Sequence, residues 1–224
     1  MFNPIKPAYS TLPQWYKDSK IKIDKPGYNE TELNINNTAS VNVTYKTCVP
    51  FLDAMSSGYV VTTEYDIEIA QLNGYPAALW RTNKKELISG HDDVQWEGMP
   101  CPEGYFPQML KFDNELVIET PKGYSTLFTS PFNRPDLPFY SFSGIVDTDQ
   151  YPMPIHFPFF IKKDFSGIIE KGTPIIQMIP FKREKWQSKP IDYDPKYTYM
   201  AQETLASKIK RSYRQQFWSK KDYR

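Results

Sequence analysis

The segment YVVTTEYDIEI, residues 59–69, is the clearest indication of the fold in this sequence. It is rich in β-branched and aromatic residues, and its alternation over Tyr65, Ile67 and Ile69 has the period of a half-buried strand. Similar short runs follow, each bounded by Gly, Pro, Asn or Asp: PAALWR (76–81), ELVIET (115–120), YSTLF (124–128), IHFPFFI (155–161) and PIIQMIPF (174–181). Strands at such spacing, without helical periodicity between them, predict a mainly β protein, an antiparallel sandwich or barrel.

The composition fits this expectation. In 224 residues, 40% are hydrophobic and 16% aromatic, which is enough apolar surface for one core. The 20 prolines against 10 glycines favour strands separated by extended turns, because proline removes a hydrogen-bond donor and fixes φ. The sequence therefore predicts one core and excludes a wholly disordered chain.

Charge and cysteine content limit the partners and the location that can be expected for this protein. The 27 basic and 26 acidic side chains give a net charge of +1, so no global field steers the protein to nucleic acid or to a membrane. No stretch approaches 18 consecutive apolar residues, and we expect no membrane span. Cys48 and Cys101 are too few for a disulfide framework, which favours a cytoplasmic location, and we expect both to be structural thiols and not nucleophiles.

The sequence predicts three regions around the single core. Residues 1–45, with four prolines, are expected to form an extended N-terminal arm whose aromatic anchors (Phe2, Tyr9, Trp15 and Tyr16) dock on the body or on a neighbouring subunit. Residues 46–187 form the β-domain. Residues 188–224 contain a linker and an amphipathic, basic C-terminal helix, because Leu205, Ile209, Tyr213 and Phe217 recur every four residues and basic residues lie off that stripe.

Two motifs stand in the second half of the chain: GIVDTD at residues 144–149 and GTPIIQ at residues 172–177. With these motifs, residues 123–181 resemble the dUTPase family, which shares its β-fold with dCTP deaminases. The resemblance implies a dUTPase-like β-sandwich or barrel. It also implies that Asp147 orients the attacking water, Tyr151 stacks on deoxyribose, and Gln177 contacts phosphate. Arg134 stands near the place of the phosphate-binding Arg-Ser of the family.

The motifs also depart from the family pattern. Gln150 is inserted before Tyr151, and Pro152 replaces the glycine that follows the tyrosine; residues 182–224 lack the Gly-rich closing arm. The strand IHFPFFI lacks the glutamate that a deaminase needs. On a strand, an inserted residue either forms a β-bulge or turns the residue after it to the other face. We expect no bulge, so that Tyr151 packs in the core, and we expect Pro152 to end the pairing.

The leading hypothesis is therefore a protein of unknown activity, non-catalytic and without a cofactor, that acts by binding or by oligomeric assembly. We expect a homo-oligomer, with the trimer the common state of such folds. The alternative is a divergent nucleotide pyrophosphatase in which Asp147 and Asp149 bind Mg²⁺, since hard cations prefer carboxylate oxygen. The competing interpretation of these two residues is a β-turn, where aspartate is favoured.

Two weaker patterns complete the candidates. His91, Asp93 and His156 have the HxD…H spacing of a 2-oxoglutarate iron oxygenase, but no arginine stands about ten residues after His156 to bind the cosubstrate. The segment FKREKW (181–186) and the C-terminal helix could contact nucleic acid. A helix that docks its aromatic face on the body is the favoured interpretation.

The segments PFLDAMSSGY (50–59), GIVDTD (144–149) and GTPIIQMIPFKREKW (172–186) also give the whole chain a resemblance to an uncharacterised family found in bacteria and phages. This resemblance implies no activity. It fits a viral or environmental source, in which case the location is the cytoplasm of the host.

Overall fold

The protein is mainly β, as the sequence predicts. The computed structural model describes residues 3–22, 44–80, 86–192, 194–196, 198–199 and 212–223. Within these residues, twelve strands form three antiparallel sheets, and the helices are short. The chain divides into two units, which are described separately: residues 1–12, 55–183 and 223 form the first, and residues 13–54, 184–222 and 224 form the second.

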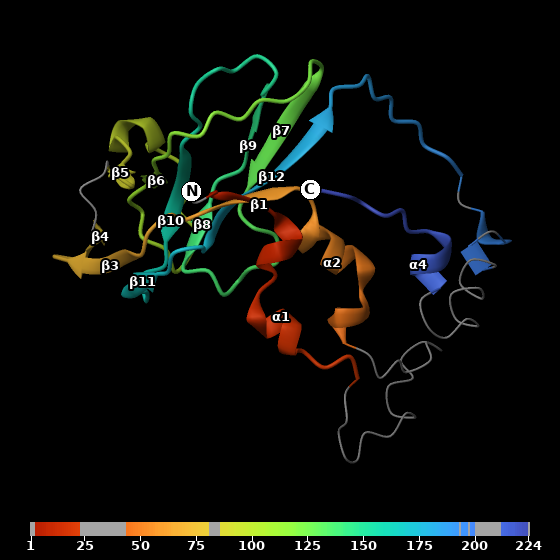
Figure 1. Ribbon diagram of the computed structural model, residues 1–224, viewed down its shortest axis with the longest axis horizontal. Coiled ribbons are helices and arrows are strands. Elements are labelled where there is room, and N and C mark those ends of the chain that lie inside the picture. Colours follow the sequence, from red (N-terminus) through yellow and green to blue (C-terminus); the bar gives the residue numbers. More distant parts are fainter. Residues whose placement is uncertain are drawn as a thin grey trace. The chain divides into compact units, whose positions relative to one another are not determined.

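The first unit contains all three sheets. The largest has the order β1-β2-β12-β7-β9, and β12, β7 and β9 can be followed side by side in Figure 1. Its strands are β1 (Ile5–Pro7), β2 (Tyr59–Thr62), β12 (Pro174–Lys182), β7 (Tyr124–Thr129) and β9 (Gly144–Val146). The nine-residue β12 is the central strand, because it pairs with β2 on one side and with β7 on the other.

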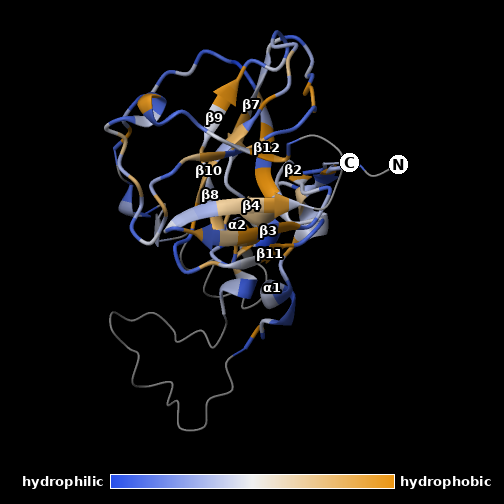
Figure 2. Cartoon of the chain, turned by 90° about the vertical axis from the view of Figure 1, so that its left-hand side faces the viewer, coloured by the Kyte–Doolittle hydropathy of each residue, from blue (hydrophilic) through white to orange (hydrophobic). Residues whose placement is uncertain are grey.

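The other two sheets are smaller. The four-stranded sheet contains β5 (Ile88–Gly90), β6 (Leu110–Phe112), β10 (Phe157–Ile161) and β8 (Phe139–Ser141), in that order. The three-stranded sheet contains β11 (Gly167–Ile169), β3 (Ile67–Leu72) and β4 (Tyr75–Trp80). Hydrophobic residues gather on the strands and hydrophilic ones in the connections, as Figure 2 shows.

One hydrophobic core joins the three sheets. Phe159 of β10 is fully buried and stacks on Phe112 of β6, with ring centroids 3.9 Å apart. Ile176 of β12 and Ile69 of β3 are buried in the same cluster. Side chains from every sheet therefore pack in one place, which accounts for the fully buried faces of these short strands.

The predicted strand 59–69 is in fact two strands in two different sheets. Thr63 directly follows β2; its N–H donates to the carbonyl of Thr173, which directly precedes β12, and its carbonyl accepts from the N–H of Gly172. Its hydroxyl also donates to the carbonyl of Glu170, at 2.8 Å. These bonds hold the chain at the break between β2 and β3, so the alternating pattern continues across a change of sheet.

The predicted strand 115–120 is also wrong, although its hydrophobic alternation has a structural role. The segment has no strand pairing; the N–H of Leu116 is bonded to the side chain of Asn114, at 2.8 Å. Leu116 and Ile118 nevertheless pack against the core, whereas Val117 is 50% exposed. An extended segment that covers the core therefore gives the same period as a strand in a sheet.

Gly58, directly before β2, is fixed by close approach of the backbone. Its φ is +70°, and a Cβ atom placed on it would lie 2.0 Å from the carbonyl oxygen of Met178 in β12. No side chain fits at that distance. Glycine is therefore required here both for the left-handed backbone and for the space.

The second unit contains helix α1 (Gln14–Asp18) and an aromatic cluster made by Trp15, Tyr16, Tyr45 and Phe51. Tyr16 is 5% exposed, and burial raises the pKa of its hydroxyl. Two of the predicted aromatic anchors, Trp15 and Tyr16, thus pack within this unit. Helix α2 (Val49–Ser56), which the sequence analysis did not identify, begins in this unit.

The predicted C-terminal helix is only partly covered by the structure. Leu205 and Ile209 lie outside the described residues. Helix α4 (Ser212–Gln216) holds Tyr213, which is 41% exposed, and is followed by Phe217, which is 48% exposed. In the described part of the chain, no helix is long and apolar enough to cross a membrane.

Candidate functional site

The two aspartates of GIVDTD lie where three strands of the large sheet end together. Strand β7 lies between β12 and β9 and is antiparallel to both, so the ends of β12 and β9 meet near its first residues. Arg183 directly follows β12, and Asp147 directly follows β9. The sheet topology thus brings together residues that are far apart in the sequence.

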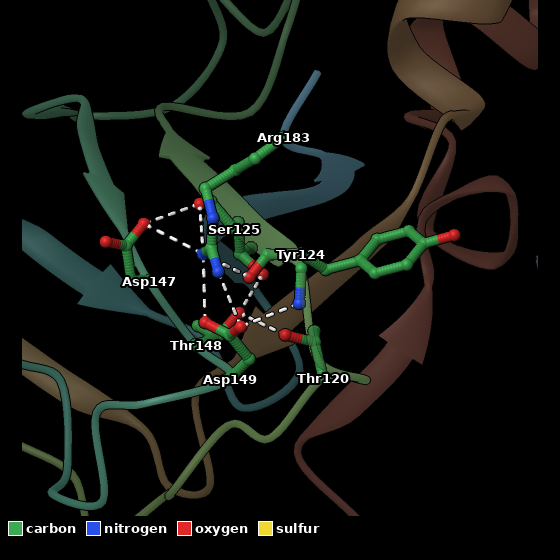
Figure 3. A network of polar contacts seen from close by, with 9 residues as sticks. Thr120, Tyr124, Ser125, Asp147, Thr148, Asp149 and Arg183 are labelled. Atoms are coloured by element: carbon green, nitrogen blue, oxygen red, sulfur yellow. Dashed lines mark hydrogen bonds and ion pairs between the residues drawn. The ribbon is translucent and has the colours of Figure 1, made fainter. Parts of the chain in front are cut away.

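Arg183 binds both aspartates. Its Nη1 atom lies 3.1 Å from Asp147 Oδ1 and 2.9 Å from Asp149 Oδ1, and its Nη2 atom lies 2.5 Å from Asp149 Oδ2. In Figure 3 the guanidinium lies between the two carboxylates. The pair with Asp149 has the forked geometry that makes arginine–carboxylate contacts strong and directional.

Main-chain and hydroxyl groups complete this network. Gly123 N–H donates to Asp149 Oδ2 at 2.7 Å, and Ser125 Oγ donates to Asp147 Oδ1 at 2.6 Å. Between the aspartates, Thr148 is 2% exposed, and its hydroxyl bonds to those of Thr120 and Thr126. The ring of Tyr124 points away from the network in Figure 3 and takes no part in it.

The two aspartates differ in environment. The side chain of Asp149 is 3% exposed, whereas that of Asp147 is 56% exposed. Hydrogen bonds from Arg183, and then from the main chain of Gly123, lower the pKa of Asp149 to about 2. In turn, the hydrogen bond with Asp149 raises the pKa of Arg183. Asp149 is thus held as a carboxylate, with the charge on Arg183 opposite to it.

The segment after β9 is a turn, which agrees with the second interpretation of the acidic pair. The carbonyl of Asp147 accepts from the N–H of Gln150 at 2.9 Å and from that of Tyr151 at 3.0 Å. Gln150 therefore falls within the turn, and no strand register exists there for it to shift. The prediction that Tyr151 packs in the core is wrong, because the residue is 38% exposed.

Gln177 and Arg134 are engaged elsewhere. Gln177 is 1% exposed; its Nε2 donates to the carbonyl of Ser57 at 2.6 Å, and its Oε1 accepts from the N–H of Phe132 at 3.0 Å. Arg134 makes a bidentate pair with Asp136, at 2.9 and 2.7 Å from Nε and Nη2. Neither side chain contributes to the Asp147, Asp149 and Arg183 network.

No protein-family model and no curated protein matches this chain.

The oxygenase pattern is not assembled. Within the described residues, no group of three or more His, Cys, Asp or Glu side chains is placed to hold a metal ion. His91 packs edge-on against Trp96, with ring centroids 5.0 Å apart, and Asp93 begins a short 3₁₀-helix, Asp93–Trp96. His156 instead places its Nδ1 atom 3.2 Å from Asp113.

His156 and Asp113 line a cavity that the sequence analysis missed. The cavity has a volume of about 680 Å³ and lies in the first unit. Its walls come from the β2–β3 connection, from β5, and from the segment that includes β6 and continues to Leu116. Asn114 fixes this last wall, because its Nδ2 donates to the carbonyl of Ile155 at 2.5 Å and its Oδ1 accepts from Leu116. The only sequence signal was an acidic and polar run, DNE, directly after a short strand.

The two cysteines are free thiols. Burial raises the pKa of Cys101, whose Sγ atom lies 3.4 Å from the carbonyl oxygen of Phe106. A raised pKa lowers the thiolate fraction, which favours a structural role for this residue.

Proposed function

We propose that this protein is non-catalytic, that it has dUTPase-like β-architecture, and that it acts by binding or by oligomeric assembly. The observation that carries the proposal is the position of Arg183 between Asp147 and Asp149. The arginine is bonded to both carboxylates that a nucleotide-hydrolysing site of this pattern would use. The GIVDTD and GTPIIQ motifs support the architecture.

The chemistry of the network argues against magnesium-dependent hydrolysis there. A Mg²⁺ ion binds through carboxylate oxygens and substrate phosphates. To bind at Asp149, it would have to displace a bidentate guanidinium and a main-chain N–H from a carboxylate whose side chain is only 3% exposed. Gln177, the expected phosphate contact, already uses both ends of its amide. The residues of the motif therefore favour a structural clasp over a catalytic site.

Assembly is supported by an apolar face on the three-stranded sheet. Ile168 of β11 and Leu79 of β4 both pair with Glu68 of β3, so the three side chains are on one face. Leu72 and Tyr75 pair further along the same hairpin. All four apolar residues are more than half exposed, at 52–59%. A second copy of this chain is the occupant we propose for this face, because homo-oligomers bury such patches in symmetric interfaces.

The direct test of the non-catalytic assignment is turnover. The purified protein would be incubated with Mg²⁺ and each of the common deoxynucleoside triphosphates, and release of pyrophosphate or phosphate would be followed. We expect no release above a protein-free control, and no rise in melting temperature with any of these nucleotides. Turnover that is lost in Asp147→Asn would establish the alternative, a divergent nucleotide pyrophosphatase.

The same proposal includes the cytoplasmic location and the resemblance to a family of bacteria and phages. The three motif segments of the sequence support that resemblance, and no activity follows from it.

A further inference from the structure

The cavity beside His156 and Asp113 has the size of a small-molecule site. Its volume of about 680 Å³ lies within the range of roughly 300–1,000 Å³ that is usual for ligand pockets. Part of its lining is apolar and belongs to the core cluster: Ile67, Phe112 and Ile175. In a ligand pocket, such surface holds the body of the molecule, and a few polar groups fix its orientation.

Polar side chains reach this cavity from several segments of the chain. The β2–β3 connection, the segment that includes β5, and the region around β6 and the start of β10 contribute Glu64, Glu86, Ser89, Asp113 and His156. A ligand with a single polar end would meet only one of these segments. A ligand that uses all of them carries hydrogen-bonding groups around its whole body.

Two polar atoms of these residues are buried and await a partner. Ser89 Oγ and Asp113 Oδ2 have no hydrogen-bond partner among the described residues. Buried polar atoms are nearly always hydrogen-bonded, so both atoms point to a ligand group. The carboxylate oxygen only accepts, whereas the serine hydroxyl both donates and accepts. A hydroxyl group of a ligand satisfies either atom, because it is a donor and an acceptor at once.

Asp113 also orients His156. Its Oδ1 atom lies 3.2 Å from His156 Nδ1. A carboxylate at this nitrogen favours the tautomer in which Nδ1 carries the proton, which leaves Nε2 as an acceptor. This side of the cavity therefore offers two acceptors, Asp113 Oδ2 and His156 Nε2, to the hydroxyl donors of a ligand.

We propose that this cavity binds a neutral polyol with a ring, a sugar or its glycoside. The hydroxyl groups of the ring exchange hydrogen bonds with Ser89, Asp113 and His156, and its apolar C–H face lies against the core residues of the lining. Recognition comes from the hydroxyl groups and not from the net charge of the lining. This inference rests on the proposed function, in which the protein acts by binding.

The test is an NMR titration with the methyl glycosides of glucose, galactose and mannose. The comparison ligand for each sugar is its fully O-methylated form, which keeps the ring and its oxygen atoms but has no hydroxyl donor. We expect at least one glycoside to shift the amides of residues 111–116 saturably, and its O-methylated form to bind at least about tenfold more weakly. No saturable shift with any of the glycosides, or equal affinity for the O-methylated form, would overturn the proposal.

The residues are tested with Ser89→Ala. The Ser89 hydroxyl has no hydrogen-bond partner among the described residues, so its removal should leave the melting temperature unchanged or raise it. The affinity for the bound glycoside should fall by about fivefold, the effect of one hydrogen bond. Asp113→Asn keeps the shape of the side chain and should weaken binding at least as much. The control is Ser188→Ala, an exposed serine outside the cavity, and should leave the affinity unchanged.

Equal affinities in Ser89→Ala and Ser188→Ala would contradict the assigned contacts. Failure of this inference can be distinguished from failure of the proposed function. Nucleotide turnover would overturn the non-catalytic assignment without changing the glycoside titration. Absence of glycoside binding in a protein without turnover would overturn this inference alone.

Discussion

At Asp149, a nearly buried carboxylate accepts hydrogen bonds from Arg183 and from the main chain of Gly123. These bonds lower its pKa to about 2, below the ordinary value of 3.8. Because the folded state favours the charged form, this group stabilises the fold fully at neutral pH. The contribution is lost as the pH falls from about 4 through about 2, where the folded-state group also becomes protonated.

Asp149→Asn should therefore lower the stability of the protein at neutral pH. Urea unfolding of the wild type and the variant would be compared at about pH 7 and about pH 2. We expect a clear difference at neutral pH that shrinks toward the acid end. Asp147→Asn is the matched control, and its effect should be smaller because the Asp147 side chain is 56% exposed. A difference that does not change with pH would contradict the assigned role.

Gly58 gives a second prediction at the residue scale. In Gly58→Ala the new Cβ would lie 2.0 Å from the Met178 carbonyl, so β2 or β12 must shift. The matched control is Gly74→Ala, because Gly74 has a similar φ of +82° but no atom within 4 Å of its Cβ position. Chemical denaturation should show a loss of about 1–2 kcal/mol for Gly74→Ala, from backbone strain alone. The loss for Gly58→Ala should exceed about 3 kcal/mol. Equal losses would show that the close approach does not matter.

At the scale of the elements, the buried faces of the strands carry the stability. Phe159→Ala should cost about 3–5 kcal/mol in the free energy of unfolding, because a fully buried ring stacked on Phe112 is lost. Tyr151→Ala should cost only about 1 kcal/mol, since the ring is 38% exposed. Urea denaturation of both variants measures the difference. If Tyr151→Ala lost as much stability as Phe159→Ala, the side chain of Tyr151 would be packed in the core, as the sequence predicted.

Short runs of apolar and β-branched residues predicted several of the strands but not where they break or pair. The segments 124–128 and 174–181 correspond closely to β7 and β12, although the burial of neither strand alternates; residues 174–178 are all buried. The pattern could not show that Thr63 is bonded to the 170–173 segment, so residues 59–69 were predicted as one strand. The three-residue strands, such as β5 and β6, are too short to show a period at all.

The candidate site was predicted in part. Asp147 and Asp149 do converge, but on Arg183, which the sequence analysis had placed in a segment that could contact nucleic acid. That convergence depends on β7 lying between β12 and β9, a topological fact that spacing along the chain does not contain. For the same reason, the cavity wall around Asp113 could not be foreseen.

At the scale of the whole molecule, the apolar face of the three-stranded sheet predicts association. Light scattering of the wild type should give a mass of at least twice the 26.2 kDa of one chain. Leu79→Lys combined with Ile168→Lys places two cations on the proposed interface and should produce a monomer with unchanged secondary structure. The control is Ile145→Lys, because Ile145 is 65% exposed and lies on β9, in the five-stranded sheet. A monomeric wild type would contradict the proposed oligomeric assembly.

The most direct test of the structural clasp is an NMR titration of its own carboxylates. In protein labelled with ¹³C at aspartate, the Asp147 and Asp149 carboxyl resonances would be followed while Mg²⁺ and deoxynucleoside triphosphates are added at neutral pH. The proposed clasp predicts that both resonances stay in place, because Arg183 holds both carboxylates and no metal displaces it. A saturable shift of both resonances that requires Mg²⁺ and nucleotide together would contradict the non-catalytic assignment and identify a nucleotide site.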